Sequence, residues 1–499
     1  MIPLDPAPRP IDHILRGAPD APALIERAGP IGFAELELQV AAAAGWLLRQ
    51  GLVPGDRVAT WLPKTRLACV MPLAAPRAGL VHVPINPLLR RAQVAHILAD
   101  SGAALLVSQP SRLETLAGDD IPPQCRTESE DAVSLGGDGP GRSSAEVDAL
   151  AAILYTSGST GRPKGVMLSH ANLWLGAVSV AHYLGLASDD RVLGVLPLSF
   201  DYGQNQLFST WAAGAAVAPL DYLSARDVVK AVEREAATTL AGVPPLWVQL
   251  LDADWPPDTA ARLRRLTNSG GALTPRLVKG LRERFPRADV YAMYGLTESF
   301  RSTYLDPALI DANPDAMGKA IPFAEILSVR ADGTRAVPGE PGELVHAGPL
   351  VAQGYWRDPD RTAQRFRPAP AFAASAGMAV WSGDTVIEGT DGLFRFVGRD
   401  DEMIKSAGNR ISPTEVEEAV LAGGEVSEAV AIGVPDARLG QAIVVVVAGD
   451  ASAEPALRTR LKSVLPSFMQ PARYEWRERL PRNANGKLDR AALRTEVTS

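Results

Sequence analysis

The chain has 499 residues, of which 46% are hydrophobic and 21% are charged. This is the composition of an ordinary folded protein, so a disordered, collagen-like or coiled-coil chain is excluded. The net charge is −7 at pH 7 and the isoelectric point is near 5.6, which gives no overall basic surface and no expected nucleic-acid partner. At roughly 100–200 residues per domain, the length indicates about three structural units.

The sequence shows no targeting signal and contains only two cysteines. No apolar run approaches the ~18 residues that a membrane-spanning helix needs, so we expect no membrane partner. Residues 1–10 are proline-rich and lack the basic start and apolar core of a secretory signal. The two cysteines, Cys69 and Cys125, exclude a disulfide framework and a cysteine-built zinc site. We therefore expect a reduced, cytoplasmic protein.

Strand and helix patterns alternate through the first 150 residues. Residues 33–50 have the pattern of a helix, residues 60–62 follow a Pro-Gly-Asp turn, and residues 80–84 have the pattern of a buried strand. Such alternation is typical of a doubly wound α/β architecture. It resumes between residues 150 and 320, where we expect strands at 192–197, 215–219, 238–243 and 288–293.

The pattern changes after residue 320. Short strand patterns and turns from about 325 to 398 predict a small β-barrel-like unit. Helix patterns at 414–421 and 455–465 and an apolar strand pattern at 442–448 predict a compact C-terminal α+β domain. We expect an N-terminal domain over 1–398, a hinge over 399–401 and a C-terminal domain over 402–499.

A Gly- and Ser-rich loop follows the apolar strand pattern at 151–154. Its sequence, YTSGSTGRPKG at 155–165, combines glycines that let the backbone approach a ligand with hydroxyls and one ammonium group. Such a loop can direct backbone N–H groups at phosphate oxygens. It is not a Walker loop, because two residues separate its glycine from its lysine. The candidate phosphate contacts are Thr156, Ser157, Gly158, Ser159, Thr160, Gly161 and Lys164.

Four further motifs follow in order: YGLTE at 294–298, SGD at 382–384, GRDDEMIK at 398–405 and PRNANGKLDR at 481–490. Together with the loop, they resemble the motifs of the adenylate-forming superfamily of acyl-CoA synthetases, peptide-synthetase adenylation domains and luciferases. The SGD motif departs from the family's TGD by a serine. The resemblance implies a large AMP-binding α/β domain with a mobile C-terminal lid. It also implies ATP and Mg²⁺ as cofactors, and a carboxylic acid with either CoA or a holo carrier protein as partners.

The resemblance assigns a nucleotide site to particular residues. Tyr294 would stack on adenine, and Asp384 would accept hydrogen bonds from the ribose hydroxyls. Thr297 would bind the α-phosphate, and Glu298 would hold Mg²⁺ against the phosphates. The other nucleotide contacts that the resemblance implies are Gly270, Gly271, Ala272, Met293, Gly295, Arg399 and Arg410.

Lys487 is the main candidate for catalysis, with Thr297 and Glu298 completing the set. A compact ammonium group suits the point where a carboxylate and an α-phosphate meet and negative charge builds up. In the family, the acid first forms acyl-AMP with loss of pyrophosphate, and the C-terminal domain then rotates so that a thiol can attack. Asp401 matches the hinge position, and Gly408 would face the thiol tunnel.

The acid pocket leaves three readings open. The pair Phe200-Asp201 resembles the corresponding residues of amino-acid adenylation domains, in which the aspartate binds the α-amine of the substrate. A buried carboxylate needs a cation, which is either that ammonium group or Arg301. In the third reading Arg301 binds a second carboxylate of the substrate. By the same resemblance the pocket is lined by Asp201, Tyr202, Asn205, Leu246, Thr267, Ser269, Met293, Arg301 and Ser302.

The polar lining favours an amino acid or another polar acid over a plain fatty or aryl acid. A narrower resemblance, through residues 200–203, 242–247 and 300–304, is to AMP-forming acyl-CoA ligases associated with exosortase systems. It leaves CoA and a free-standing carrier protein equally open as acceptor. A luciferase-type oxidoreductase and a non-catalytic nucleotide-binding protein are the other readings. No residue indicates the former, and the presence of Lys487 and Glu298 argues against the latter.

Overall fold

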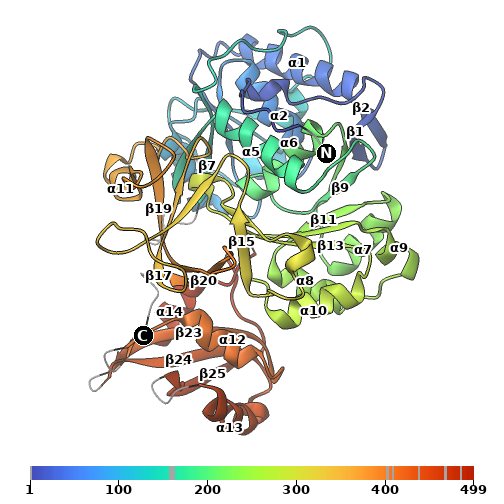
Figure 1. Cartoon of the computed structure of the whole chain (residues 1–499). Coiled ribbons are helices and arrows are strands. Elements are labelled where there is room, and N and C mark those ends of the chain that lie inside the picture. The colour runs from blue at the N-terminus through green and yellow to red at the C-terminus, as the bar shows by residue number, and fades with distance from the viewer. Residues whose placement is uncertain are drawn as a thin grey trace.

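The computed structural model describes residues 3–156, 163–399, 404–406, 409–436, 439–465, 469–483 and 486–498. A large N-terminal domain contains two mainly parallel sheets and an antiparallel β unit, and a small α+β domain lies below it (Figure 1). This mixed α/β fold confirms the predicted fold class. Within the described residues, no helix is long and apolar enough to cross a membrane.

The first sheet has six strands. Their spatial order is β6 (Arg126–Ser129), β5 (Leu105–Ser108), β3 (Arg57–Trp61), β4 (Val81–Pro84), β7 (Leu150–Thr156) and β8 (Lys164–Ser169). All neighbours are parallel except β7 and β8, which form an antiparallel hairpin. The helices of this region are α1 (Phe33–Arg49), α2 (Arg66–Arg77), α3 (Arg91–Ser101) and α4 (Pro110–Leu113).

The second sheet continues the α/β alternation. Its order is β2 (Gly29–Gly32), β1 (Pro22–Glu26), β10 (Ala216–Pro219), β9 (Arg191–Gly194), β11 (Thr239–Gly242), β12 (Arg265–Asn268) and β13 (Asp289–Tyr294), parallel except for β1 and β2. Its helices are α5 (His170–Tyr183), α6 (Asp201–Ala212), α7 (Ala225–Arg234), α8 (Pro244–Leu251), α9 (Pro257–Arg262) and α10 (Pro275–Arg284). The carboxyl ends of β12 and β13 meet at one edge, where α/β sheets bind ligands.

The antiparallel β unit begins earlier than the sequence pattern predicts. Its strands are β14 (Thr303–Tyr304), β15 (Ala316–Ala320), β16 (Glu325–Val329), β17 (Pro341–Ala347), β18 (Phe366–Pro368), β19 (Met378–Glu388) and β20 (Phe394–Arg399), with helix α11 (Pro359–Arg365). Because β14 pairs with β13, the unit extends the second sheet directly. This continuity brings β19 to the carboxyl end of β13.

The C-terminal domain packs three helices on a third, smaller sheet. Its strands are β21 (Ile404–Ser406), β22 (Asn409–Ile411), β23 (Val426–Asp436), β24 (Gly440–Gly449) and β25 (Arg473–Arg477), and its helices are α12 (Pro413–Leu421), α13 (Glu454–Val464) and α14 (Arg490–Thr498). The predicted strand at 442–448 is the buried part of β24, which confirms that both of its faces are covered. The hinge at 399–401 remains a proposal, because Asp401 lies outside the described residues.

Side-chain caps mark the beginning of two of the helices that border the space between the domains. The Thr274 hydroxyl accepts from the Leu277 N–H at 3.2 Å at the start of α10. The Ser412 hydroxyl accepts from the Glu415 N–H at 3.3 Å at the start of α12. Each cap is followed by a proline, whose fixed φ suits the first helical position. The local sequence thus fixes where these helices begin.

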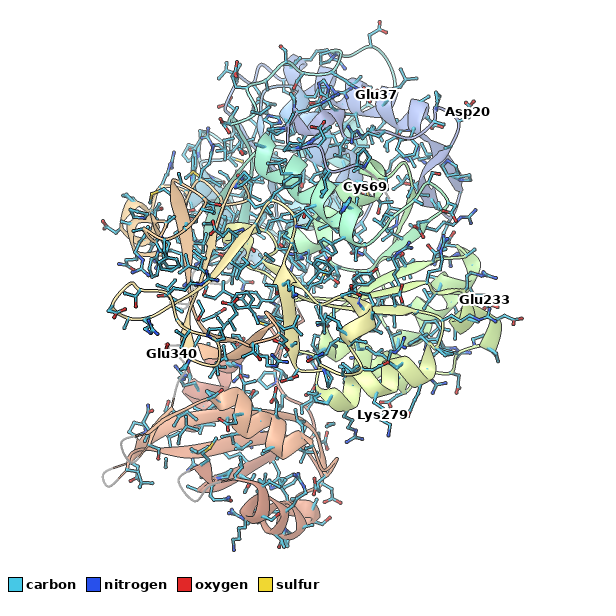
Figure 2. All side chains as sticks on the ribbon, viewed as in Figure 1. Asp20, Glu37, Cys69, Glu233, Lys279 and Glu340 are labelled. Atoms are coloured by element: carbon cyan, nitrogen blue, oxygen red, sulfur yellow. The ribbon has the colours of Figure 1, made fainter. Side chains whose placement is uncertain are left out.

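The two cysteines are both buried and do not form a disulfide. Cys69 lies on α2 inside the N-terminal domain (Figure 2), where burial raises the pKa of its thiol to about 12. Burial also raises the pKa of the Cys125 thiol to about 11. Thiols in this state are poor nucleophiles.

We predict that Gly318→Ala destabilises the protein much more than Gly333→Ala. Both glycines have positive φ, +89° and +83°, so both changes carry a backbone cost of about 1 kcal/mol. Only at Gly318 would the new Cβ collide with the backbone, 1.8 Å from the Tyr304 carbonyl oxygen, whereas nothing lies within 4 Å at Gly333. Thermal unfolding of the two variants measures the difference, and equal shifts of the midpoint would contradict it.

Candidate active site

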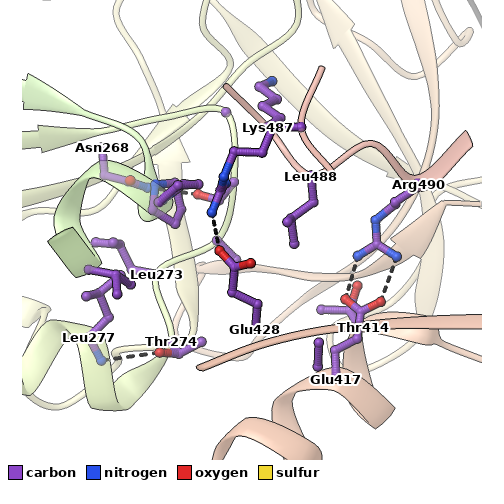
Figure 3. A pocket seen from close by; sticks show the side chains of 18 of the residues that line it. Asn268, Leu273, Thr274, Leu277, Thr414, Glu417, Glu428, Lys487, Leu488 and Arg490 are labelled. Atoms are coloured by element: carbon purple, nitrogen blue, oxygen red, sulfur yellow. Dashed lines mark hydrogen bonds and ion pairs between the residues drawn. The ribbon is translucent and has the colours of Figure 1, made fainter. Parts of the chain in front are cut away.

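A cleft of about 2560 Å³ lies between the N-terminal and C-terminal domains. Thr156, Tyr294 and Asp384 line it from the N-terminal domain, and Lys487 lines it from the C-terminal domain. Figure 3 shows this meeting of the domains, with Asn268 and Leu273 on one side and Lys487 on the other. The structure therefore gathers residues from four of the five sequence motifs around one space.

The predicted phosphate loop lies in sequence between β7 and β8, which pair as an antiparallel hairpin. Thr156 ends β7 and pairs in register with Lys164, which begins β8. The predicted contacts Ser157, Gly158, Ser159, Thr160 and Gly161 lie outside the described residues. A Walker loop joins a strand to a helix, whereas this loop joins two paired antiparallel strands.

Lys164, Glu298 and Tyr355 form a compact polar cluster beside this hairpin. The Lys164 ammonium lies 2.9 Å from Glu298 Oε1 and 2.6 Å from the Tyr355 hydroxyl. The same hydroxyl donates to Glu298 Oε1 at 2.6 Å. The ammonium also lies 4.1 Å from the centre of the Tyr355 ring, a favourable cation–π distance. These contacts fix the position of the Glu298 carboxylate.

Glu298 is ionised and suited to hold a cation together with a nucleotide. Burial by itself raises its pKa, but the charge of Lys164 and the Tyr355 hydrogen bond outweigh burial and hold the pKa below the ordinary value. Among the described residues, no three His, Cys, Asp or Glu side chains are arranged around a metal position. Because Mg²⁺ commonly takes one or two carboxylates and completes its shell with phosphate and water, this donor set fits a nucleotide-bound Mg²⁺.

The end of β13 and the middle of β19 form the side of the site predicted for the nucleoside. The Tyr294 hydroxyl donates to the Asp384 carboxylate. Ser382 accepts from the Asp384 N–H at 3.0 Å and donates to the Leu344 carbonyl at 2.6 Å. The serine therefore supplies the hydroxyl that a threonine would place in the family motif. The side chains of Arg399 and Arg410 lie outside the described residues.

Lys487 reaches across the cleft to the loop after β12. Gly270 in that loop has φ +82°, and a Cβ added to it would lie 2.9 Å from Lys487 Cε and 3.1 Å from Nζ. Lys487 itself is held by Asn483, whose side-chain oxygen accepts from its N–H at 3.1 Å. Gly271 and Ala272 also line the cleft. The structure thus places the predicted catalytic ammonium beside the loop predicted to approach the nucleotide.

A strained turn connects the two halves of the site. Phe300 has φ +66°, although its ring is almost completely buried and packs on Gly176, where a Cβ would lie 2.6 Å from Cζ. Such a backbone conformation costs about 1–3 kcal/mol and persists when packing enforces it. Across this turn Glu298 faces Lys164, whereas Arg301 faces Asp201.

Asp201 and Arg301 form a buried ion pair. Arg301 Nη1 contacts Asp201 Oδ2, and the Thr297 hydroxyl donates to Asp201 Oδ1 at 3.1 Å. The Arg301 guanidinium also lies 4.4 Å from the Tyr202 ring centre. Of the three interpretations of the sequence, the structure shows the ion pair between Asp201 and Arg301. The Asp201 carboxylate is therefore neutralised by Arg301 even when no substrate is bound.

A cavity of about 20 Å³ lies behind this ion pair. Tyr202 borders it and donates to the Thr267 carbonyl at 2.7 Å. Its other polar lining residues are Asn205, Gln206, Ser209, Thr239, Thr267 and Arg301, and its apolar lining includes Val180, Leu184, Val192 and Met293. The cavity admits about one water-sized group.

Three predicted pocket residues lie behind the site. Leu246, Ser269 and Ser302 are buried and line neither the cleft nor the small cavity. Ser302 forms a hydrogen bond of 3.0 Å with His346 Nδ1 on β17. It faces the β unit because successive residues of an extended segment point in opposite directions, and Arg301 takes the direction of the pocket.

Sequence reasoning missed Tyr355, Gln206 and Thr239. Gln206 follows Tyr202 by four residues on α6, so helical periodicity placed it on the same face and could have identified it. Tyr355 and Thr239 carry no such local signal, because only the tertiary structure brings them near Glu298 and Arg301.

The depressed pKa of Glu298 predicts a stabilising effect that acid removes. An unfolded glutamate titrates near pH ~4.3. Because the folded pKa lies lower, ionised Glu298 stabilises the folded state above the unfolded pKa, and this contribution is lost as pH falls through the folded pKa.

Thermal unfolding of the wild type and Glu298→Gln between pH 7 and pH 3 tests this. We expect the wild type to be more stable at pH 7 and this advantage to shrink below about pH 4.3. Glu233→Gln, at a surface position on α7 (Figure 2), is the control that should show no such change. A difference that stays constant with pH would contradict the assignment.

Comparison with known proteins identifies the family. Residues 11–356 match the model of the AMP-binding enzyme family, and residues 415–487 match that of the AMP-binding enzyme C-terminal domain. The chain is 33% identical to a feruloyl-CoA synthase from an Amycolatopsis species, covering 96% of both chains. It is 30% identical to an L-proline–[L-prolyl-carrier protein] ligase from Pseudomonas fluorescens, covering 97% of this chain and 98% of that one.

Solved structures give the same result. ATP-bound MatB from Rhodopseudomonas palustris superposes with a TM-score of 0.87 at 27% identity, covering 99% of both chains. The o-succinylbenzoate CoA synthetase MenE from Bacillus subtilis, in complex with its acyl-adenylate, superposes with a TM-score of 0.86 at 26% identity over 99% and 98% of the two chains. The chain therefore belongs to the AMP-binding enzyme family of the adenylate-forming superfamily, and it is an AMP-forming ligase that uses ATP and Mg²⁺.

Proposed function

We propose that this ligase activates a small polar carboxylic acid, with amino acids favoured, and transfers it to the thiol of CoA or of a free-standing carrier protein. The observation that carries the proposal is the position of the Asp201–Arg301 pair. Thr297 contacts Asp201, so the pair lies directly beside the residue proposed for the α-phosphate. When the substrate's carboxylate reacts there, the atoms next to that carboxylate lie close to the charged side chains of Asp201 and Arg301.

The shape of the pocket supports a short acid. The cavity behind the ion pair measures about 20 Å³, and polar side chains share its wall with apolar ones. A long alkyl chain would leave those polar groups without partners, which is unfavourable. The relative named as an L-proline–[L-prolyl-carrier protein] ligase supports an amino acid as the acid and a carrier protein as the acceptor.

A plain aryl acid with CoA as acceptor is the second candidate. The specific observation in its favour is that Arg301 already neutralises Asp201, so the pocket does not require a substrate ammonium group. The relative named as a feruloyl-CoA synthase points in the same direction. An aryl acid would need the side chains around the small cavity to move apart.

The proposed reaction has two steps. A carboxylate oxygen of the acid attacks the α-phosphorus of ATP, a P–O bond forms, and pyrophosphate leaves. Lys487 would stabilise the negative charge of this step, and Glu298 would hold the Mg²⁺, which supplies charge neutralisation at the phosphates when bound. A thiol then attacks the acyl carbon and AMP leaves. We place Asp401 at the hinge and Gly408 at the thiol tunnel for this second step, as the sequence motifs imply.

ATP–pyrophosphate exchange against amino acids, short and medium fatty acids, and aryl acids tests the acid class. We expect exchange to be strongest with an amino acid or another small polar acid. Asp201→Ala should then lower the exchange rate for the best substrate. Exchange with aryl or fatty acids alone would contradict the proposal and favour the second candidate.

We predict that Lys487→Ala lowers the rate of adenylate formation by about 100–1000-fold while the protein stays folded. The physical reason is the loss of the ammonium group that the C-terminal motif brings beside Gly270. Lys462→Ala, at an exposed position on α13 of the same domain, is the matched control and should retain full activity. Pyrophosphate release by Lys487→Ala at a near-normal rate would refute the assignment.

A further inference from the structure

We propose that the acid carries a second carboxylate at its far end and that Arg301 binds this group through its Nε–Nη2 edge. The inference rests on the proposed function and narrows its substrate class to dicarboxylic acids, which include the acidic amino acids. It depends on how Arg301 is fixed, on which of its donors are unused and on what surrounds them.

Arg301 is held firmly through one of its three nitrogens. Nη1 contacts Asp201 and donates to the Phe300 carbonyl at 3.0 Å. The guanidinium plane is further packed by aromatic rings, 4.4 Å from the Tyr202 ring centre and 5.5 Å from that of Phe300. Only 2% of the residue is exposed. A guanidinium fixed in this way is a preorganised donor rather than a flexible surface charge.

The opposite edge of the guanidinium is unused. Arg301 Nε is fully buried and has no hydrogen-bond partner, and within the described residues no hydrogen bond reaches Nη2. A buried donor without a partner is costly. The Nε–Nη2 edge presents two parallel N–H groups whose spacing matches the two oxygens of a carboxylate. The described part of the protein supplies acceptors for Nη1 but none for the Nε–Nη2 edge, which can therefore bind a carboxylate of the substrate.

The neighbouring cavity contains further unused donors. Asn205 Nδ2 and the Thr239 hydroxyl are buried without hydrogen-bond partners, and both residues line the cavity together with Arg301. Its remaining walls include the apolar side chains of Val180 and Leu184. The volume of about 20 Å³ admits about one water-sized group, so binding of a whole carboxylate requires the surrounding side chains to move apart.

The charge balance favours an acid that also carries an amine. Asp201 and Arg301 neutralise each other, so a substrate that adds one ammonium group and one further carboxylate leaves the buried site neutral. Both oxygens of Asp201 already accept hydrogen bonds, from Arg301 and Thr297, whereas the donors of Arg301 are only partly used. Among the described residues that line the cavity, Arg301 Nε, Asn205 Nδ2 and the Thr239 hydroxyl lack partners against one acceptor, Gln206 Oε1. A second carboxylate therefore meets most of the unmet demand.

Matched acids that differ in one terminal group provide the test. ATP–pyrophosphate exchange is measured with glutamate against glutamine, aspartate against asparagine, and glutarate against pentanoate. We expect kcat/KM for the dicarboxylic member of at least one pair to exceed that of its partner by about 100-fold or more, because an unpaired buried donor penalises the partner. Equal use of both members of every pair would overturn the inference.

Variants of Arg301 test the residue itself. Arg301→Lys keeps the charge but loses the paired donors, so the preference for the second carboxylate should fall at least about tenfold. Arg301→Gln combined with Asp201→Asn removes both charges together, avoids an unpaired buried carboxylate and should abolish the preference. Arg66→Gln, at a partly exposed ion pair with Glu26, is the control that should keep it. A preference retained by the double variant, with an unchanged unfolding midpoint, would overturn the assignment.

The same panel separates failure of the inference from failure of the proposed function. Exchange with neutral amino acids or other neutral polar acids, without any preference for a second carboxylate, overturns the inference and leaves the proposed function in place. Exchange with aryl or fatty monoacids alone overturns both. Strong exchange with glutarate but not with glutamate supports the inference and assigns a substrate without an amine.

Discussion

The turn from Thr297 to Arg301 is the constraint on which both halves of the site depend. Its positive φ at Phe300 is held by a ring buried against Gly176. A relaxed backbone would swing Arg301 away from Asp201 or Glu298 away from Lys164, since the two side chains are only three residues apart. The energetic cost of the turn is thus coupled to function, because it allows one short segment to serve both the nucleotide and the acid.

The nucleotide side of the site is assembled from elements that are far apart in the chain. The β7–β8 hairpin supplies Lys164, the end of β13 supplies Tyr294, and β19 supplies Asp384. The antiparallel β unit achieves this because it is joined to β13 through β14 and so extends the main sheet. Lys487 then enters the cleft from the C-terminal domain, so its position beside Gly270 depends on how that domain docks.

The buried Asp201–Arg301 pair gives the acid pocket its character. Burying two charges is costly, and the pair is retained here with additional contacts from Thr297, Phe300 and Tyr202 that reduce this cost. Replacing the pair by apolar residues would make a simpler pocket for a fatty acid. Its presence, together with unused donors on Arg301 and Asn205, is the physical basis for proposing a polar substrate.

The sequence by itself determined the fold class, the buried strand within β24 and the motifs whose residues Tyr294, Asp384 and Lys487 line one cleft. These features are readable because periodicity, glycine content and motif spacing are local properties of the chain. Tertiary structure alone decided that Arg301 pairs with Asp201, that Tyr355 contacts Glu298, and that Ser302 turns toward His346. Such partners lie some 40 to 100 residues apart, and their choice depends on strand pairing and on the direction of one strained turn, which no local pattern encodes.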